Sequence, residues 1–126
     1  MMPDGKGHPS LKKSFLYALE GILLALRTER NIKLILILGF ITIIAGLIAQ
    51  LETWAWCLII LLTGLLAFAE LINTALESLV DLACPEYHEL AKKTKDIAAG
   101  AVLVLSITAV LIGIVLFGDV LLERLF

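Results

Sequence analysis

The sequence predicts an all-α integral membrane protein, with three transmembrane helices preceded by an amphipathic helix on the membrane surface. Of its 126 residues, 60% are hydrophobic, well above the roughly 45–50% of globular domains. Charged residues make up only 17% of the chain and gather at the ends of the apolar runs. The formal net charge of −2 comes with no basic face, so no nucleic-acid partner is expected. We therefore expect one membrane domain over residues 1–126.

The surface helix is expected over residues 10–27, after a short polar tail at 1–9 that we expect to be disordered. Apolar residues recur there with a helical period, and charged ones lie between them: Leu11, Phe15, Leu19, Ile22, Leu23 and Leu26 against Lys12, Lys13 and Glu20. Such a segment is too charged to cross a bilayer and too apolar for water, which favours a position on the membrane surface. Packing against the protein alone is the alternative.

Three apolar runs follow, at 32–51, 54–82 and 97–118, each long enough to cross a hydrocarbon core of about 30 Å. Lys and Arg are concentrated before the first run and between the second and third. By the positive-inside rule, the N-terminus and the 83–96 loop face the cytoplasm and the C-terminus lies outside. Small residues in the third run indicate close helix packing, and hence an oligomer.

Polar residues form a stripe along the second predicted transmembrane helix. Relative to Glu70, Asn73 lies at roughly −60°, Glu77 at about −20° and Asp81 at about +20° around the helix axis. An ionised carboxylate is costly to expose to lipid, so this stripe should face a protein interior or a wet cleft. Glu77 and Asp81 lie at the predicted cytoplasmic interface, and Glu70 lies deeper.

These residue types suit phosphoryl transfer to a lipid alcohol. Glu29 and Glu77 could hold Mg²⁺, which prefers oxygen ligands and often completes its shell with phosphate oxygens. Lys95 could place positive charge on the same phosphates. Glu70 could accept the proton of an alcohol. Asn73 could hold Glu70 or a hydroxyl group by hydrogen bonds.

Two other functions fit Glu70 and Asn73. The residues could belong to an ion-coupled transport subunit with Glu70 as its intramembrane carboxylate, although three spans without an inverted repeat argue against it. They could instead join helices in a non-catalytic membrane scaffold. The chain has neither a Walker-A pattern nor a kinase glycine-rich loop. A nucleotide site would therefore differ from those of soluble kinases.

Three motifs resemble the prokaryotic diacylglycerol kinase family, which includes the undecaprenol kinases of Gram-positive bacteria. They are Glu70-x-x-Asn73-x-x-x-Glu77, Glu86-Tyr87-His88-x-Leu90 and Lys95-Asp96. The resemblance implies a homotrimer of three-span subunits in the bacterial inner membrane, each with an N-terminal surface helix. It also implies transfer of the ATP γ-phosphate to diacylglycerol or undecaprenol, with ATP–Mg²⁺ bound at the cytoplasmic interface. Two further segments, 27–31 and 71–75, look more like the undecaprenol kinase branch.

The resemblance also implies a role for individual residues. It makes Glu70 the general base, supported by Asn73, and makes Glu29 and Glu77 the metal ligands. The implied ATP contacts are Tyr17, Glu29, Glu77, Glu86, Tyr87, His88, Lys95 and Asp96.

Overall fold

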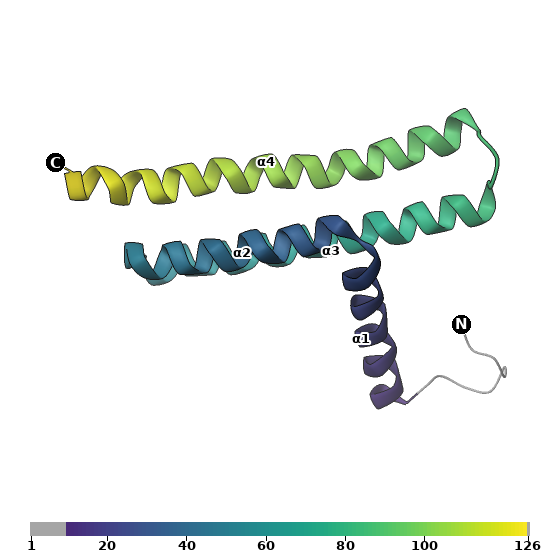
Figure 1. Ribbon diagram of the computed structural model, residues 1–126, viewed down its shortest axis with the longest axis horizontal. Coiled ribbons are helices and arrows are strands. Elements are labelled where there is room, and N and C mark those ends of the chain that lie inside the picture. The colour runs from purple at the N-terminus through teal and green to yellow at the C-terminus, as the bar shows by residue number, and fades with distance from the viewer. Residues whose placement is uncertain (1–9, 126) are drawn as a thin grey trace.

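The computed structural model describes residues 10–125, which fold into four helices and contain no strand within that range. They are α1 (Leu11–Thr28), α2 (Arg30–Ala49), α3 (Thr53–Ala83) and α4 (Glu89–Leu125). Figure 1 shows α2, α3 and α4 running along the long axis of the molecule, with α1 extending away from them at the start of α2. The predicted all-α class is confirmed, and α2, α3 and α4 are long and apolar enough to cross a membrane. The predicted disordered tail at 1–9 lies outside the described residues.

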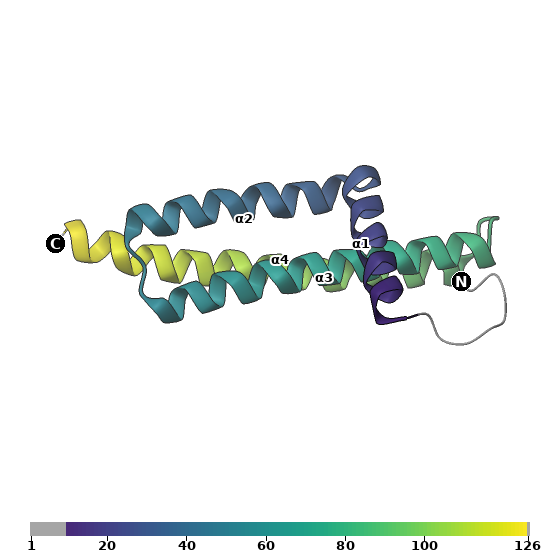
Figure 2. The same cartoon turned by 90° about the horizontal axis from the view of Figure 1, so that it is seen from below.

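Helix α3 lies at the corner of the three-helix bundle. In Figure 1, α2 overlaps α3 while α4 lies apart; in Figure 2, at a right angle to the first view, α3 overlaps α4 while α2 lies apart. The contacts agree with the two views, because α3 packs extensively on both neighbours and α2 barely touches α4. Helix α3 is therefore the one helix of the described bundle that packs extensively on both of the others.

Two glycines let α2 approach α3 closely. A Cβ on Gly39 would lie 3.0 Å from Cγ2 of Thr63, and one on Gly46 would lie 2.9 Å from Cη2 of Trp56. These pairs fix an antiparallel register that advances by seven residues on each helix, the spacing of a helix–helix seam. One further step along the seam brings Ile32, which is buried, level with Glu70. The register thus ties the start of α2 to the polar stripe of α3.

The end of the bundle farthest from α1 is closed by apolar packing. Ala55, Ile59 and Leu116 are buried together, and Trp56 and Phe117 pack against them. Helix α2 ends at Gln50, whose φ of 54° is left-handed. The Leu51 N–H donates to the Gly46 carbonyl at 3.2 Å, and the Gln50 N–H donates to the Leu47 carbonyl at 3.2 Å. This is a Schellman motif with glutamine at the position that glycine usually occupies.

Helix α4 begins well before the predicted span. We expected a loop over 83–96 and a span over 97–118, but the helix starts at Glu89, so most of that loop is helical. His88 Nδ1 accepts a hydrogen bond from the Leu90 N–H at 3.2 Å, and the Thr94 hydroxyl donates to the Leu90 carbonyl at 2.9 Å. Hydropathy marks where a helix could meet lipid, whereas helix formation also extends through polar residues. Which part of α4 crosses the membrane stays a prediction.

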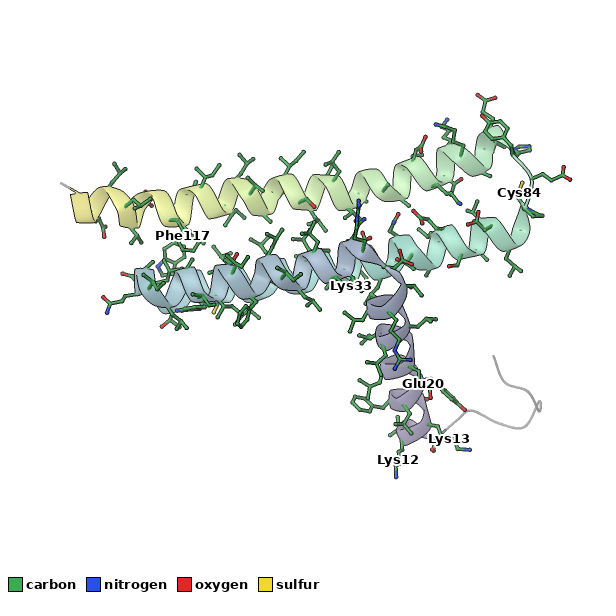
Figure 3. All side chains as sticks on the ribbon, viewed as in Figure 1. Lys12, Lys13, Glu20, Lys33, Cys84 and Phe117 are labelled. Carbon is green, nitrogen blue, oxygen red and sulfur yellow. The ribbon has the colours of Figure 1, made fainter. Side chains whose placement is uncertain are left out.

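Helix α1 occupies the position predicted for the surface helix, and its location on the membrane stays a prediction. Ala25 is its one buried residue. Ser10 stands at the N-cap, yet its side chain makes no capping hydrogen bond. Figure 3 shows Lys12 and Lys13 at the end of α1 farthest from the bundle, and Lys33 where α1 meets α2. Lys33 Nζ donates to the Arg27 carbonyl at 3.1 Å, which helps to join the two helices.

Candidate active site

The polar stripe of α3 passes from the interior of the bundle to its surface. Glu70 is 2% exposed and Asn73 is 7% exposed, whereas Glu77 is half-buried and Asp81 is exposed. The stripe was expected to avoid lipid. Glu70 and Asn73 do so, because the helices of a single chain already bury them. Ionisable groups are rarely buried this far unless they are paired or have a function.

Some polar atoms of the stripe form hydrogen bonds and others do not. Asn73 Nδ2 donates to Glu77 Oε1 at 3.2 Å, the arrangement expected of residues four apart on a helix. Asn73 thus holds Glu77, where the sequence had indicated Glu70 or a hydroxyl group as its partner. Glu70 Oε2 and Asn73 Oδ1 are buried without a hydrogen-bond partner among the described residues. A buried polar atom in this state costs about 1–3 kcal/mol, and a bound hydroxyl group would remove that cost.

A charged cavity of about 290 Å³ opens at the α3–α4 connection. Five of the eight ATP contacts that the resemblance implies line it, namely Glu86, Tyr87, His88, Lys95 and Asp96. The connection itself is short and ordered, since Cys84 Sγ donates to the Glu86 carbonyl at 3.4 Å. Figure 3 shows Cys84 at this end of the bundle, beyond the level at which α1 meets α2. The fold therefore gathers residues from two helices and their connection around one opening.

Two charged residues of this cavity, Asp81 and Lys92, were not among the predicted site residues. Asp81 accepts a hydrogen bond from Lys95 Nζ across the connection, and Lys92 Nζ lies 2.6 Å from Asp96 Oδ2 along α4. Both Asp81 and Lys92 line the cavity. Asp81 had been noted as part of the stripe; a spacing of fourteen residues across a turn gave no direct sign of its pairing with Lys95.

Tyr17 and Glu29, on α1 and at its junction with α2, do not line this cavity. Glu29 lies between the two helices, and its Oε1 accepts a hydrogen bond from the Thr28 hydroxyl at 3.0 Å. Extended to the start of α2, the register set by Gly39 and Gly46 would place Glu29 level with Asn73, about one helical turn from Glu77. Tyr17 is exposed on α1. Within the described residues, no group of three or more His, Cys, Asp or Glu side chains is arranged to hold a metal ion.

A large apolar groove of about 780 Å³ runs between α2 and α4, with α3 as its floor. Its hydroxyl groups, on Thr42, Thr63 and Ser106, donate to carbonyls of their own helices at 2.8, 2.8 and 2.9 Å. Their donors are therefore occupied, and the groove presents mainly Leu, Ile and Val side chains. Such a surface suits a hydrocarbon chain, because it makes few polar demands on its ligand.

Fold and polar site together define a helical membrane protein with an acidic centre at one end of its apolar bundle. The profile of the prokaryotic diacylglycerol kinase family matches residues 16–117. The chain is 45% identical over 106 residues to the diacylglycerol kinase of Synechocystis sp., which is 83% of this chain and 61% of that protein. It is 41% identical over 105 residues to the undecaprenol kinase of Bacillus subtilis, covering 83% of this chain and 85% of that protein. It is also 35% identical over 102 residues to the diacylglycerol kinase of Helicobacter pylori, covering 81% and 80%.

The chain belongs to the prokaryotic diacylglycerol kinase family. The resemblance seen in the three sequence motifs is thus confirmed over most of the chain. Its relatives are lipid kinases, which are phosphotransferases, and they come from bacteria. Together with the three apolar helices, they indicate a bacterial membrane protein. The aligned region spans less than two thirds of the Synechocystis relative, but most of the other two.

Proposed function

We propose that this chain is an ATP-dependent lipid kinase that transfers the γ-phosphate of ATP to the hydroxyl group of a membrane lipid alcohol. The observation that carries the proposal is the continuity of two features on α3. A buried carboxylate with an unpaired oxygen lies within the bundle, and a charged cavity opens beyond it at the end of the same helix. Relatives named for diacylglycerol and for undecaprenol make either alcohol a candidate acceptor.

In the proposed reaction, Glu70 acts as the general base. Its unpaired Oε2 accepts the proton of the lipid hydroxyl as that oxygen attacks the γ-phosphorus. A new phosphorus–oxygen bond forms, the bond from the γ-phosphorus to its bridging oxygen breaks, and ADP leaves. Asn73 donates to Glu77 and so helps to orient that carboxylate. The single proton of the lipid hydroxyl goes to Glu70. Burial protects this proton transfer from competing water.

The nucleotide is proposed to lie over the cavity at the α3–α4 connection. Lys95 would contact the phosphates, while Glu86, Tyr87, His88 and Asp96 would contact the rest of the nucleotide. Tyr17 would approach from α1, and the carboxylates of Glu29 and Glu77 would lie towards the phosphates. This arrangement places the nucleotide on the aqueous side of Glu70 and the lipid on its apolar side.

Glu29 and Glu77 are the proposed ligands of Mg²⁺. The extended register, which would place them about one helical turn apart, is compatible with a shared ion. Each keeps a carboxylate oxygen outside the hydrogen bonds to Thr28 and Asn73. Mg²⁺ commonly binds through one or two carboxylates and takes its other ligands from phosphate and water, so this small donor set fits. When bound, the ion would neutralise negative charge on the transferring phosphate.

We further propose a cytoplasmic site in a homotrimer. In this arrangement α1 lies on the cytoplasmic surface of the inner membrane, the N-terminus and the α3–α4 connection are cytoplasmic, and the C-terminus is outside. Lysines on α1 and at the start of α4 support the orientation. Many large apolar side chains of α2, α3 and α4 are exposed in one chain, and lipid or other copies would cover them.

The test is phosphorylation by purified protein in mixed lipid–detergent micelles. ADP release and phosphorylated lipid are measured with diacylglycerol, with undecaprenol and without added alcohol, at fixed ATP and Mg²⁺. We expect ADP release to require one of the alcohols and to match the phosphorylated lipid formed. ATP consumption that ignores the added alcohol, or no consumption with either alcohol, would overturn the proposal. The better acceptor identifies the substrate.

A further inference from the structure

Asp81 and Lys95 form the one ion pair between different helices in the described part of the chain. Asp81 lies in the last turn of α3 and Lys95 in the second turn of α4, fourteen residues away. The other ion pair, Lys92 with Asp96, is local to α4 and joins residues four apart. Asp81 and Lys95 thus connect the two helices that frame the charged cavity.

Stability does not account for this pair. The Lys95 and Asp81 side chains are 33% and 66% exposed, and ion pairs in such surroundings stabilise a fold only weakly. Both charges also oppose the helix dipole. Asp81 lies near the partly negative C-terminus of α3, and Lys95 lies near the partly positive N-terminus of α4. The helix dipoles alone would favour a cation near the C-terminus of α3 and an anion near the N-terminus of α4.

The pair has a geometric effect on the cavity. Asp81 and Lys95 both line it, and the hydrogen bond holds the lysine ammonium at its edge. An ammonium has three donors, so one bond to Asp81 leaves two for another acceptor. A free lysine side chain has many rotamers, and fixing it before a ligand arrives lowers the entropic cost of binding.

We propose that Asp81 is a positioning residue that holds Lys95 for the phosphates of ATP. This inference rests on the proposed function, since it takes the phosphates to be the ligand of Lys95. Asp81 itself does not contact the nucleotide. Its carboxylate repels phosphate, but its exposure lets water and salt screen that repulsion. The tether therefore outweighs the repulsion, and losing Asp81 weakens ATP binding.

The experiment is a double-mutant cycle on ATP binding, measured by titration calorimetry of the full-length protein in detergent with Mg²⁺ and no lipid alcohol. We expect Asp81→Asn to raise the Kd for ATP about three- to tenfold, in line with the freedom regained by one side chain. Lys95→Met should raise it further, and Asp81→Asn should add nothing to Lys95→Met. Asp81→Glu keeps the charge and should recover part of the loss.

Glu89→Gln is the matched control, because it removes the same charge from the start of α4, where Glu89 has no ion pair among the described residues. Its Kd for ATP should equal that of the wild type, and its thermal midpoint should stay the same or fall slightly, because Glu89 is placed favourably in the first turn of α4. Asp81→Asn should leave the midpoint nearly unchanged, so its weaker ATP binding cannot be explained by a loss of folded protein.

Three results would overturn the positioning role. A lower Kd in Asp81→Asn would mean that the carboxylate competes with phosphate. An equal loss in the Lys95→Met background would mean that Asp81 does not act through Lys95, and an unchanged Kd in Lys95→Met would remove Lys95 from the nucleotide. Because binding is measured without turnover, a failure of lipid phosphorylation in the assay above remains a separate result.

Discussion

The two ends of α3 are built on opposite principles. At its N-terminal end, Ala55 and Ile59 are buried in apolar packing, and Trp56 fills the space beside Gly46. In its C-terminal half, Glu70 and Asn73 are buried, each with an oxygen that has no partner among the described residues. The first end follows the rules of close packing, and the second breaks the rule that buried polar groups are paired.

This contrast separates what stabilises the protein from what makes it react. A helix optimised only for stability would have apolar residues along its whole buried face. Two buried polar atoms without hydrogen bonds lower the stability of the fold. Buried polar atoms of this kind are expected where a protein binds a ligand or carries out a reaction. If so, changes at the two ends should affect different observables, and the following predictions test this separation.

The largest effect is expected at the polar end. Glu70→Gln keeps the size and much of the hydrogen bonding of the side chain but removes the base. Turnover should fall by roughly 10²–10⁴, the usual contribution of a positioned general base, while ATP still binds. The check is lipid phosphorylation beside ATP binding in the same preparation. Near-normal turnover in Glu70→Gln would mean that another group takes the proton.

At the packed end, stability should change and turnover should not. In Gly46→Ala the added methyl would lie 2.9 Å from Trp56 and 3.2 Å from Leu51, so one of these side chains must move. Overpacking of this kind typically costs about 1–3 kcal/mol, which thermal unfolding in detergent would detect. The specific activity below the unfolding range should stay at the wild-type value.

Gly64→Ala is the control for Gly46→Ala, because it makes the same substitution on α3 where nothing lies within 4 Å of the added methyl. Its midpoint should be unchanged or slightly higher, since alanine favours the helix. If Gly64→Ala is the more damaging of the two, the seam between α2 and α3 is not what holds this end together.

The next expected effect concerns the metal and separates two members of the stripe. Glu77→Gln should raise the Mg²⁺ concentration for half-maximal activity several-fold, because one of two proposed ligands is lost. Glu29→Gln should do the same, and the double variant should lose less than the two effects added together. Glu70→Gln should leave the midpoint of the Mg²⁺ titration in place. An unmoved midpoint in Glu77→Gln would remove it from the metal site.

The smallest expected effect lies in the turn between α2 and α3. Gln50 has a φ of 54°, a conformation that glycine adopts without strain. Gln50→Gly should therefore stabilise the fold by up to about 1 kcal/mol, the left-handed penalty less the added freedom of the unfolded chain. Thermal unfolding would show a small rise in midpoint with unchanged activity. A fall would mean that the Gln50 side chain makes a contact worth more than the backbone strain.

Much of this molecule follows from its sequence. Four helices were expected near the positions where they occur. The three long apolar runs predicted three of them, and the helical period of apolar residues near the N-terminus predicted the fourth. The burial of Glu70 and Asn73 also followed, since a stripe of carboxylates on an apolar helix has few other places to go. Family membership came from the spacing of residues within α3 and beyond the connection, and the comparisons confirm it.

What the sequence missed depends on contacts between elements. Hydropathy placed the start of the last helix at residue 97, although polar residues from Glu89 onwards continue it. The bond of Asn73 to Glu77 depends on side-chain rotamers, and the pairing of Asp81 with Lys95 depends on how two helices meet. The proposed height of Glu29 beside the stripe rests on the register of α2 against α3, which Gly39 and Gly46 set. These contacts between side chains and between helices cannot be predicted from the pattern of a single sequence.

The central claim is that Glu70 is kept for reaction at the expense of stability, and Glu70→Met tests it most directly. Methionine fills a similar volume and removes the unpaired oxygen of Glu70, so that only Asn73 Oδ1 stays unpaired within the described part of the bundle. Thermal midpoint and lipid phosphorylation are measured on the same preparation beside the wild type. We predict a higher midpoint with turnover lost. A lower midpoint would contradict the claim, because it would make Glu70 a structural contact between helices.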